Sequence, residues 1–308
     1  MLDDLPILLL GLACAGGGGE LFVRGAVGIA ESARVPPGIV GATVAAFATS
    51  SPELAVAISS GLSGRSELAL GDALGSNVVN VGLVLGLALL VGPMRVAGGV
   101  VRRDIAAALA IPIATVALVA DGRLSRLDAV VLLVLFAVWL AASLDEARRE
   151  RSAAGEVLGE HSPVRAALAG AAGLVLLVAA GRLIVSGASS IGADLGLDTF
   201  VIGVVLVAVG TSVPELATTV VARLRGHDEV GLGTILGSNV FNGALIVPVA
   251  ALLSPVPIDR DEVATSLGFG IALVVCVLPL GGMLGRGRGA LLVCGYAASV
   301  AALLLMHA

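Results

Sequence analysis

The chain has 308 residues, of which 57% are apolar and only 13% are charged. A water-soluble domain carries about 25% charged residues, so this composition excludes a soluble globule and predicts an all-α polytopic protein in a lipid bilayer. The small net charge of −5, with no basic stripe between aromatic residues, argues against a nucleic-acid partner.

The chain contains ten apolar stretches long enough to cross a bilayer, which requires roughly 20 mainly apolar residues each. The predicted transmembrane helices are 5–30, 36–61, 67–92, 101–120, 127–143, 164–190, 197–223, 229–253, 262–281 and 289–306. Acidic residues precede the first stretch, whereas a cleaved signal peptide begins with basic ones. We therefore expect an uncleaved first helix.

The least apolar insert, residues 145–163, lies between spans five and six and is predicted to be a solvated, partly helical linker. All basic residues other than the three histidines are arginines. With the N-terminus outside, thirteen arginines lie on the inner side of the membrane and four on the outer side. Cytoplasmic loops carry an excess of basic residues, so this bias predicts both termini outside and a cytoplasmic linker.

Two motifs occur twice in the chain. FATSSPELA at 47–55 is followed by LGSNVVN at 74–80, and VGTSVPELA at 209–217 is followed by LGSNVFN at 236–242. Both motif pairs are separated by 162 residues. The constant spacing indicates that the chain consists of two copies of one unit.

This duplication predicts a first five-helix repeat at 1–144 and a second at 164–308, joined by the linker. Because five is odd, the second repeat enters the membrane from the opposite side. The predicted fold is therefore ten transmembrane helices in two inverted five-helix repeats, an architecture typical of secondary transporters.

The duplication aligns Glu53 with Glu215. A carboxylate within a membrane span costs about 2.5–3.5 kcal/mol on insertion scales and marks a functional site by default. Its occurrence at equivalent points of both copies indicates a shared role for the two residues.

Oxygen-bearing side chains share helix faces with these glutamates. Thr49 and Ser50 stand four and three residues before Glu53, and Ser76 and Asn80 share a face of the next span. Their equivalents in the second copy are Thr211, Ser212, Ser238 and Asn242. Hard cations such as Ca²⁺ take six to eight oxygen ligands, and with no histidine or thiol here, soft transition metals are disfavoured.

Pro52 and Pro214 directly precede the glutamates. A proline inside a helix removes one backbone hydrogen bond, so we expect it to free or tilt the carbonyl groups of Ala48 and Gly210. Freed carbonyl groups at membrane depth can line a cavity or bind ions.

Structural interpretations stand beside the functional ones. Serine and threonine in membrane helices often bond back to their own backbone, and the GSN segments are also suited to close helix packing. Glu20 and Arg182 are aligned by the duplication but differ in sign, so ion pairing or solvation near a cavity would explain them. The three cysteines have neither disulfide nor metal-ligand spacing.

Together the four motif copies resemble the two alpha-repeats of the sodium/calcium exchanger family, prokaryotic type, within the calcium/cation antiporters. The resemblance implies a multi-pass protein of the prokaryotic cell membrane that exchanges Ca²⁺ against Na⁺ by alternating access, without a cofactor. The ion ligands it implies are Glu53, Glu215, Asn80, Asn242, Thr49, Ser50, Thr211, Ser212, Ser76 and Ser238, with the backbone oxygens of Ala46 and Ala208.

Three positions depart from the family pattern. Ala48 replaces a glycine, and Asn242 stands where some exchangers carry an aspartate. Asp72 and Thr234 occupy a position that is often asparagine. Asp72 is interpreted either as a guard of the access to the site or as an acidic residue near a helix N-terminus.

Two alternatives to Na⁺/Ca²⁺ exchange stay open. Buried carboxylates can bind protons, so an H⁺-coupled cation antiporter fits the same fold. Carboxylate rings also form the filters of cation channels. An enzyme is not expected, because the three histidines lie in loops or at the tail and no nucleotide-binding loop is present.

Overall fold

The computed structural model describes residues 5–33, 35, 37–96, 98–153, 162–194, 203–278 and 282–306. Apolar runs form helices here because a helix satisfies its backbone N–H and C=O groups within one segment, as a membrane requires. The helices of the first half are α1 (Leu5–Ala33), α2 (Pro37–Val40), α3 (Ala46–Thr49), α4 (Ser51–Leu62), α5 (Ser66–Val78), α6 (Gly86–Val91), α7 (Gly98–Leu118) and α8 (Arg126–Ala153). Those of the second half are α9 (Pro163–Asp194), α11 (Ala208–Thr211), α12 (Val213–Leu224), α13 (Asp228–Phe241), α14 (Val247–Leu253), α15 (Arg260–Cys276) and α16 (Arg286–Met306).

Short π-helical and 3₁₀ segments connect several of these helices. They are the π-helical η1 (Gly41–Ala45), η2 (Val79–Leu85), η4 (Gly203–Val207) and η5 (Asn242–Ile246), and the 3₁₀ segment η3 (Val119–Asp121). The order π segment, short helix, longer helix recurs in η1–α3–α4 and η4–α11–α12 at the spacing of the sequence motifs. π-helical turns are frequent at functional sites, and these four adjoin the motif residues.

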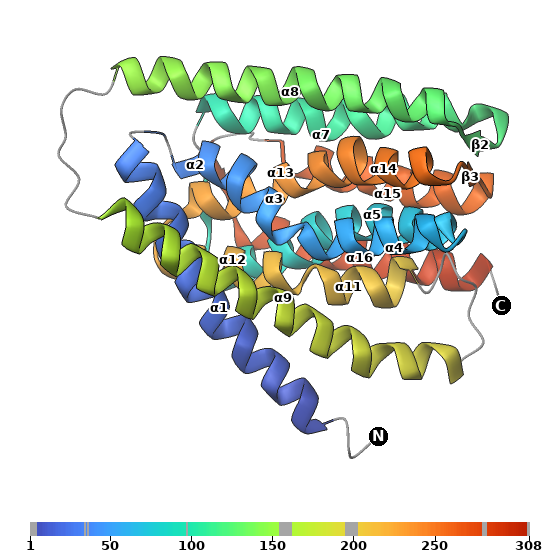
Figure 1. The fold of residues 1–308 in the computed structure, drawn as a ribbon, viewed down its shortest axis with the longest axis horizontal. Coiled ribbons are helices and arrows are strands. Elements are labelled where there is room, and N and C mark those ends of the chain that lie inside the picture. The colour runs from blue at the N-terminus through green and yellow to red at the C-terminus, as the bar shows by residue number, and fades with distance from the viewer. Residues whose placement is uncertain are drawn as a thin grey trace.

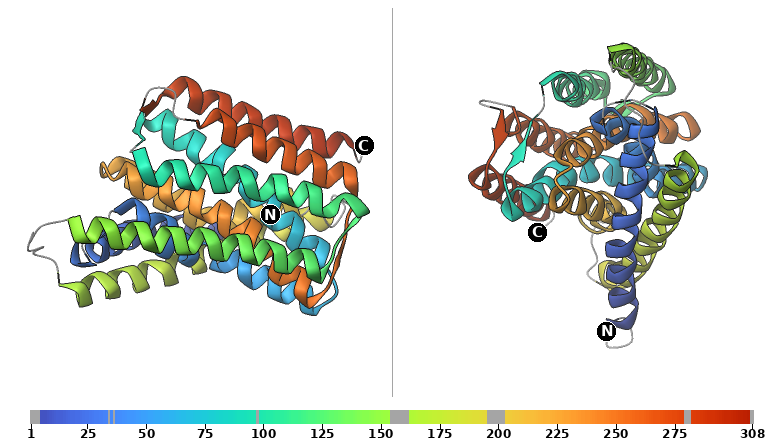
Figure 2. Two further views of the ribbon diagram at one scale, coloured as in Figure 1. Left: turned by 90° about the horizontal axis from the view of Figure 1, so that it is seen from above. Right: turned by 90° about the vertical axis from the view of Figure 1, so that its left-hand side faces the viewer.

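Two short antiparallel ribbons each pair one strand from each half. β1 (Met94–Arg95) pairs with β4 (Met283–Leu284), and β2 (Arg123–Leu124) pairs with β3 (Val256–Pro257). The two ribbons lie at opposite ends of the helix bundle (Figure 2). The two halves are therefore tied together at both ends of the molecule.

The centre of the bundle is formed by two long helical stretches, one from each half. In the most apolar 18-residue segment of Asp228–Leu253, 83% of the residues are buried, and in that of Ser66–Val91, 72% are buried. The corresponding share is 22% for α8 and for α16. Helices α7 and α8 lie along one side of this centre, while α1 and α9 pack together on the other (Figure 1). The motif helices thus lie inside the protein, and the outer helices present apolar side chains.

The prediction of an all-α protein with several membrane spans is confirmed. Within the described residues, five helical stretches are long and apolar enough to cross a membrane, or seven if each of two bent pairs counts as one span. Helices α1, α9 and α15 occupy the remaining predicted spans. The number of ten spans stays a prediction.

Helix α8 continues beyond its predicted membrane span and includes the first part of the predicted linker. This charged stretch extends the helix because its residues form i, i+4 pairs, such as Asp145 with Arg149 at 2.8 Å. The rest of the predicted linker, residues 154–161, lies outside the described residues.

Candidate functional site

The site is built on two broken helices, one in each half. Helices α3 and α4 meet at Ser50 with a bend of 42°, and α11 and α12 meet at Ser212 with a bend of 49°. Both serines leave helical geometry in the same way, with φ/ψ of −81°/10° and −80°/6°. The break falls two residues before the proline, which cannot donate a hydrogen bond to the preceding turn.

The residue at each break still donates its backbone N–H to the short helix before it. Ser50 N donates to Ala46 O at 2.9 Å and Ser212 N donates to Ala208 O at 3.1 Å, with Ala48 and Gly210 as secondary acceptors of the same N–H groups. The bend is absorbed by the last turn of the short helix, because the N–H groups at the cap reach these oxygens. Pro52 and Pro214 have no N–H to donate to Ala48 and Gly210, and the freeing of these two carbonyl groups stays a prediction.

The two motif glutamates lie in the first turns of α4 and α12 and are both fully buried. Glu215 Oε1 accepts hydrogen bonds from Ser50 at 3.3 Å and from Ser238 at 3.0 Å. Neither oxygen of Glu53 has a hydrogen-bond partner, and neither has Oε2 of Glu215. The two carboxyl groups are close enough to interact electrostatically.

Further hydrogen bonds connect the two halves around the glutamates. The hydroxyl groups of Ser76 and Thr211 are 3.3 Å apart, and Thr211 donates to Asp72 Oδ1 at 3.0 Å. The Ser50–Glu215 bond also joins the halves. The motif residues of the two halves therefore form a single polar site in the middle of the bundle.

The last asparagines of the LGSNVVN and LGSNVFN motifs, Asn80 and Asn242, lie where α-helix changes to π-helix. Asn80 lies in η2 and donates to Asn239 Oδ1 at 3.2 Å, while its own Oδ1 has no partner. Asn242 begins η5, and neither its amide nitrogen nor its oxygen has a partner. Both asparagines are fully buried in the bundle, and π-helical turns are frequent at functional sites.

The structure brings the twelve predicted ligands into the interior. All of them are buried: Ala46, Thr49, Ser50, Glu53, Ser76, Asn80, Ala208, Thr211, Ser212, Glu215, Ser238 and Asn242. The Thr49 hydroxyl also bonds back to its own helix at Ala46 O, 3.3 Å away, and Ala208 O lies 3.3 Å from the Thr211 hydroxyl as an alternative acceptor to Asp72. Ion binding by the set stays a prediction.

Several oxygens of this set are buried without a hydrogen bond, which is unfavourable in the absence of a ligand. An unsatisfied buried polar group costs about 1–3 kcal/mol, and a charged one more. Within the described residues, no group of three or more His, Cys, Asp and Glu side chains converges as in a tight metal centre. Hydroxyl, amide and backbone oxygens would therefore supply most ligands of a bound cation, as suits a hard cation.

Glycines of the two LGSN motifs allow the site helices to approach closely. A Cβ atom on Gly75 would lie 2.6 Å from Val204 Cα, and one on Gly237 would lie 2.7 Å from Ala42 Cα. The next residue of the first motif, Ser76, contacts Thr211 in the broken helix of the other half, while Ser238 of the second motif reaches Glu215. Close packing and a role in the site are thus combined in these motifs.

The comparisons with known proteins agree with this geometry. The family model described as sodium/calcium exchanger protein matches residues 5–144 and 166–305. The chain belongs to the sodium/calcium exchanger family. The resemblance noted in the sequence is thereby confirmed.

Relatives of this family member match over nearly its whole length. Inner membrane protein YrbG of Escherichia coli is 32% identical over 96% of this chain and 95% of its own. Sodium/calcium exchanger MaX1 of Methanosarcina acetivorans is 28% identical over 95% of this chain and 96% of its own. Among solved structures, the sodium-calcium exchanger NCX_Mj soaked with Na⁺ and Sr²⁺ superposes with a TM-score of 0.82, at 29% identity and 97% coverage of both chains.

Sequence reasoning left Asp72 out of the site, although the structure places it there. Glu67, not Asp72, occupies the first turn of α5, so the interpretation of Asp72 as a helix N-terminal residue is wrong. The signal in the sequence is its spacing, because Asp72, Ser76 and Asn80 follow each other at intervals of four and share a helix face.

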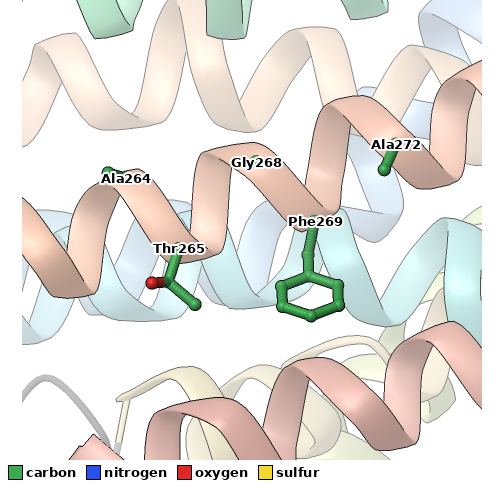
Figure 3. A pocket seen from close by; sticks show the side chains of 5 residues that line it. All are labelled: Ala264, Thr265, Gly268, Phe269 and Ala272. Atoms are coloured by element: carbon green, nitrogen blue, oxygen red, sulfur yellow. The ribbon is translucent and has the colours of Figure 1, made fainter.

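Two other features lie away from this site. Glu20 accepts hydrogen bonds from Arg24 and Arg225, in line with the ion-pair interpretation, whereas the side chain of Arg182 is outside the described ones. An open pocket of about 340 Å³ lies on α15, lined by Ala264, Thr265, Gly268, Phe269 and Ala272 (Figure 3). It contains no carboxylate and is no candidate for the cation site.

Proposed function

We propose that this protein is a secondary antiporter that exchanges Ca²⁺ for Na⁺ across the membrane by alternating access. The observation that carries the proposal is the junction of the two motif copies: Glu215 accepts a hydrogen bond from Ser50 of the other half, and Glu53 lies nearby with both oxygens unpartnered. The ions named for the relatives support the choice of Ca²⁺ and Na⁺.

In the proposed cycle, Ca²⁺ binds between Glu53 and Glu215 and is replaced by Na⁺ at overlapping oxygen ligands. Either ion neutralises the buried carboxylates, so the loaded protein can pass through a closed state. The empty protein keeps bare charges in a low-dielectric interior, which is unfavourable. This difference enforces exchange and suppresses a leak, and the chain transports ions without transforming them chemically.

Helices α1 and α9 are the proposed moving elements. They pack along each other at glycines, and a Cβ atom on Gly25 would lie 2.5 Å from Gly170 Cα. Both lie on one side of the central helices (Figure 1). Sliding of this pair would open the site first to one side of the membrane and then to the other.

The proposed topology has ten spans in two inverted repeats, at 1–144 and 164–308, with a cytoplasmic linker at 145–163. The recurrence of element order and the two crosswise ribbons support it. Met94–Arg95 would lie at the cytoplasmic end and Arg123–Leu124 at the outer end, as the arginine bias suggests. The C-terminus lies at the end that carries β2 and β3, which supports its outside location (Figure 1).

Transport by purified protein in liposomes tests the proposal. With Na⁺ inside and ⁴⁵Ca²⁺ outside, the outward Na⁺ gradient should drive Ca²⁺ uptake that collapses when a Na⁺ ionophore is added. No uptake above protein-free liposomes would contradict the proposal. Equal uptake driven by a pH gradient without Na⁺ would favour the H⁺-coupled alternative, and single-channel currents would favour a channel.

A further inference from the structure

We infer that Asp72 holds a second cation position beside the Glu53–Glu215 pair and determines how many Na⁺ ions are exchanged for one Ca²⁺. The inference rests on the proposed function, because it concerns the same polar site. Its basis is the geometry of one carboxyl group that the sequence motifs do not include.

Asp72 is buried in the interior and only partly satisfied. Its side chain lies in α5 with 1% of the residue exposed. Oδ1 accepts a hydrogen bond from Thr211 at 3.0 Å, whereas Oδ2 has no partner. A buried carboxylate oxygen without a donor requires either a cation or a proton.

The hydroxyl groups of Thr211 and Ser76 form a connected chain beside Asp72. A threonine hydroxyl has a single proton, so when Thr211 donates it to Asp72, the contact between Ser76 and Thr211 must be donated by Ser76. The oxygens of both hydroxyl groups keep lone pairs for a cation. Asp72, Thr211 and Ser76 thus provide a carboxylate and two neutral oxygens at one place.

The site contains three buried carboxyl groups. Asp72 is close enough to both Glu53 and Glu215 for their charges to interact. No arginine of the described part of the chain forms an ion pair with any of the three. One divalent ion would compensate the two glutamates and leave the charge of an ionised Asp72, which another cation would compensate.

The third carboxylate does not converge with the glutamates on one point. The described residues hold no group of three acidic side chains with the spacing of a single metal centre. The cation at Asp72 is therefore a separate one that shares Thr211 with the main position. One carboxylate with neutral hydroxyl ligands matches the charge of a monovalent ion.

The second half offers no equivalent position. Thr234 takes the place of Asp72 there, and its hydroxyl donates to its own helix at Val230 O, 2.8 Å away. The additional cation is therefore expected on one side of the pseudo-symmetric site only.

The test measures ⁴⁵Ca²⁺ binding to the purified full-length protein and its displacement by Na⁺. Asp72→Asn removes the charge but keeps the oxygen that accepts from Thr211. Glu67→Gln is the matched control, because it removes an exposed carboxylate from the first turn of the same helix. Melting temperatures in cation-free buffer check folding, and that of Asp72→Asn should equal or exceed the wild-type value.

We expect Asp72→Asn to lower the Hill coefficient, or steepness, of Ca²⁺ displacement by Na⁺ by about one. The Na⁺ affinity should fall about tenfold or more, because a charged ligand is lost. Ca²⁺ binding should be retained and should weaken less than Na⁺ binding. The inference would be overturned if Na⁺ displaced Ca²⁺ from Asp72→Asn with the Hill coefficient and Na⁺ affinity of the wild-type protein. It would also be overturned if the affinities for Na⁺ and Ca²⁺ fell equally while the Hill coefficient stayed unchanged. Absence of mutual displacement in the wild-type protein would instead contradict the proposed function, and the inference with it.

Discussion

The two halves of the site have the same motif but hold their glutamates differently. Glu215 of the second half accepts hydrogen bonds from Ser50 and Ser238, whereas Glu53 of the first half has no hydrogen-bond partner for either oxygen. The duplicated sequence has therefore produced one carboxylate with a single hydrogen-bonded oxygen and one without any hydrogen-bond partner.

The difference begins at residues outside the shared motif. By duplication, Ser212 and Ser76 correspond to the two donors of Glu215. Ser212 Oγ has no partner, and Ser76 bonds to Thr211, which in turn donates to Asp72. In the first half, Asp72 accepts from Thr211, which contacts Ser76. In the second half, Thr234 bonds to its own helix, and Ser238 donates to Glu215. The acidic residue at position 72, with threonine at the equivalent position 234, is one chemical difference between the two halves of the site.

The largest expected effect comes from the glutamates themselves. Glu53→Gln and Glu215→Gln should each weaken Ca²⁺ binding by about 100-fold or more, about 2.7 kcal/mol, because a charged ligand is lost. In cation-free buffer, Glu53→Gln should raise the melting temperature more than Glu215→Gln, because Glu53 has no donor. Glu67→Gln and Glu229→Gln, in the first turns of α5 and α13, serve as controls. Equal melting shifts would contradict the asymmetry.

The glycine contacts should be similar in the two halves. Gly75→Ala and Gly237→Ala would each force a methyl group against a neighbouring backbone, and we expect a loss of about 1–3 kcal/mol in the free energy of unfolding. Thermal or denaturant unfolding in detergent measures the loss. Gly268→Ala is the control, because nothing lies within 4 Å of a Cβ atom there. A strong effect in one half alone would show that packing, too, is asymmetric.

The serines should respond unequally. Ser238→Ala removes a donor to Glu215, and hydrogen bonds to charged groups contribute about 1.5–3 kcal/mol, so Ca²⁺ binding should weaken about tenfold. Ser76→Ala should weaken Ca²⁺ binding less, because its hydroxyl contacts Thr211 and not a glutamate. Isothermal titration with Ca²⁺ measures both. A greater loss in Ser76→Ala would reverse the comparison drawn here.

The smallest effect is expected at Thr234. Its hydroxyl donates to the carbonyl group of Val230, one turn earlier in the same helix, and such a bond adds no stability to the helix. Thr234→Val should therefore change the free energy of unfolding by less than about 0.5 kcal/mol. Na⁺ displacement of bound Ca²⁺ should keep its wild-type steepness. A change as large as that expected for Asp72→Asn would place a cation in both halves.

The fold and most of the site were predictable because their signals are repeated in the chain. Apolar runs locate the helices, and the recurrence of the Glu53 and Glu215 motifs at one spacing identifies the polar side chains that belong to one site. The extension of α8 to Ala153 is also consistent with its helix-favouring charges. The size of the bends at Ser50 and Ser212, 42° and 49°, was not predictable, because it depends on how the cap of each short helix closes over its last turn.

Hydropathy and duplication, which belong to the linear chain, determined by themselves that this is a helical membrane protein with paired carboxylates. Only the tertiary structure decided that Asp72 lies beside these carboxylates and that the Ser76 hydroxyl contacts Thr211 instead of Glu53. These contacts depend on which helices cross at Gly75 and Gly237, and a hydroxyl group directs its proton to the acceptor that the crossing places nearest.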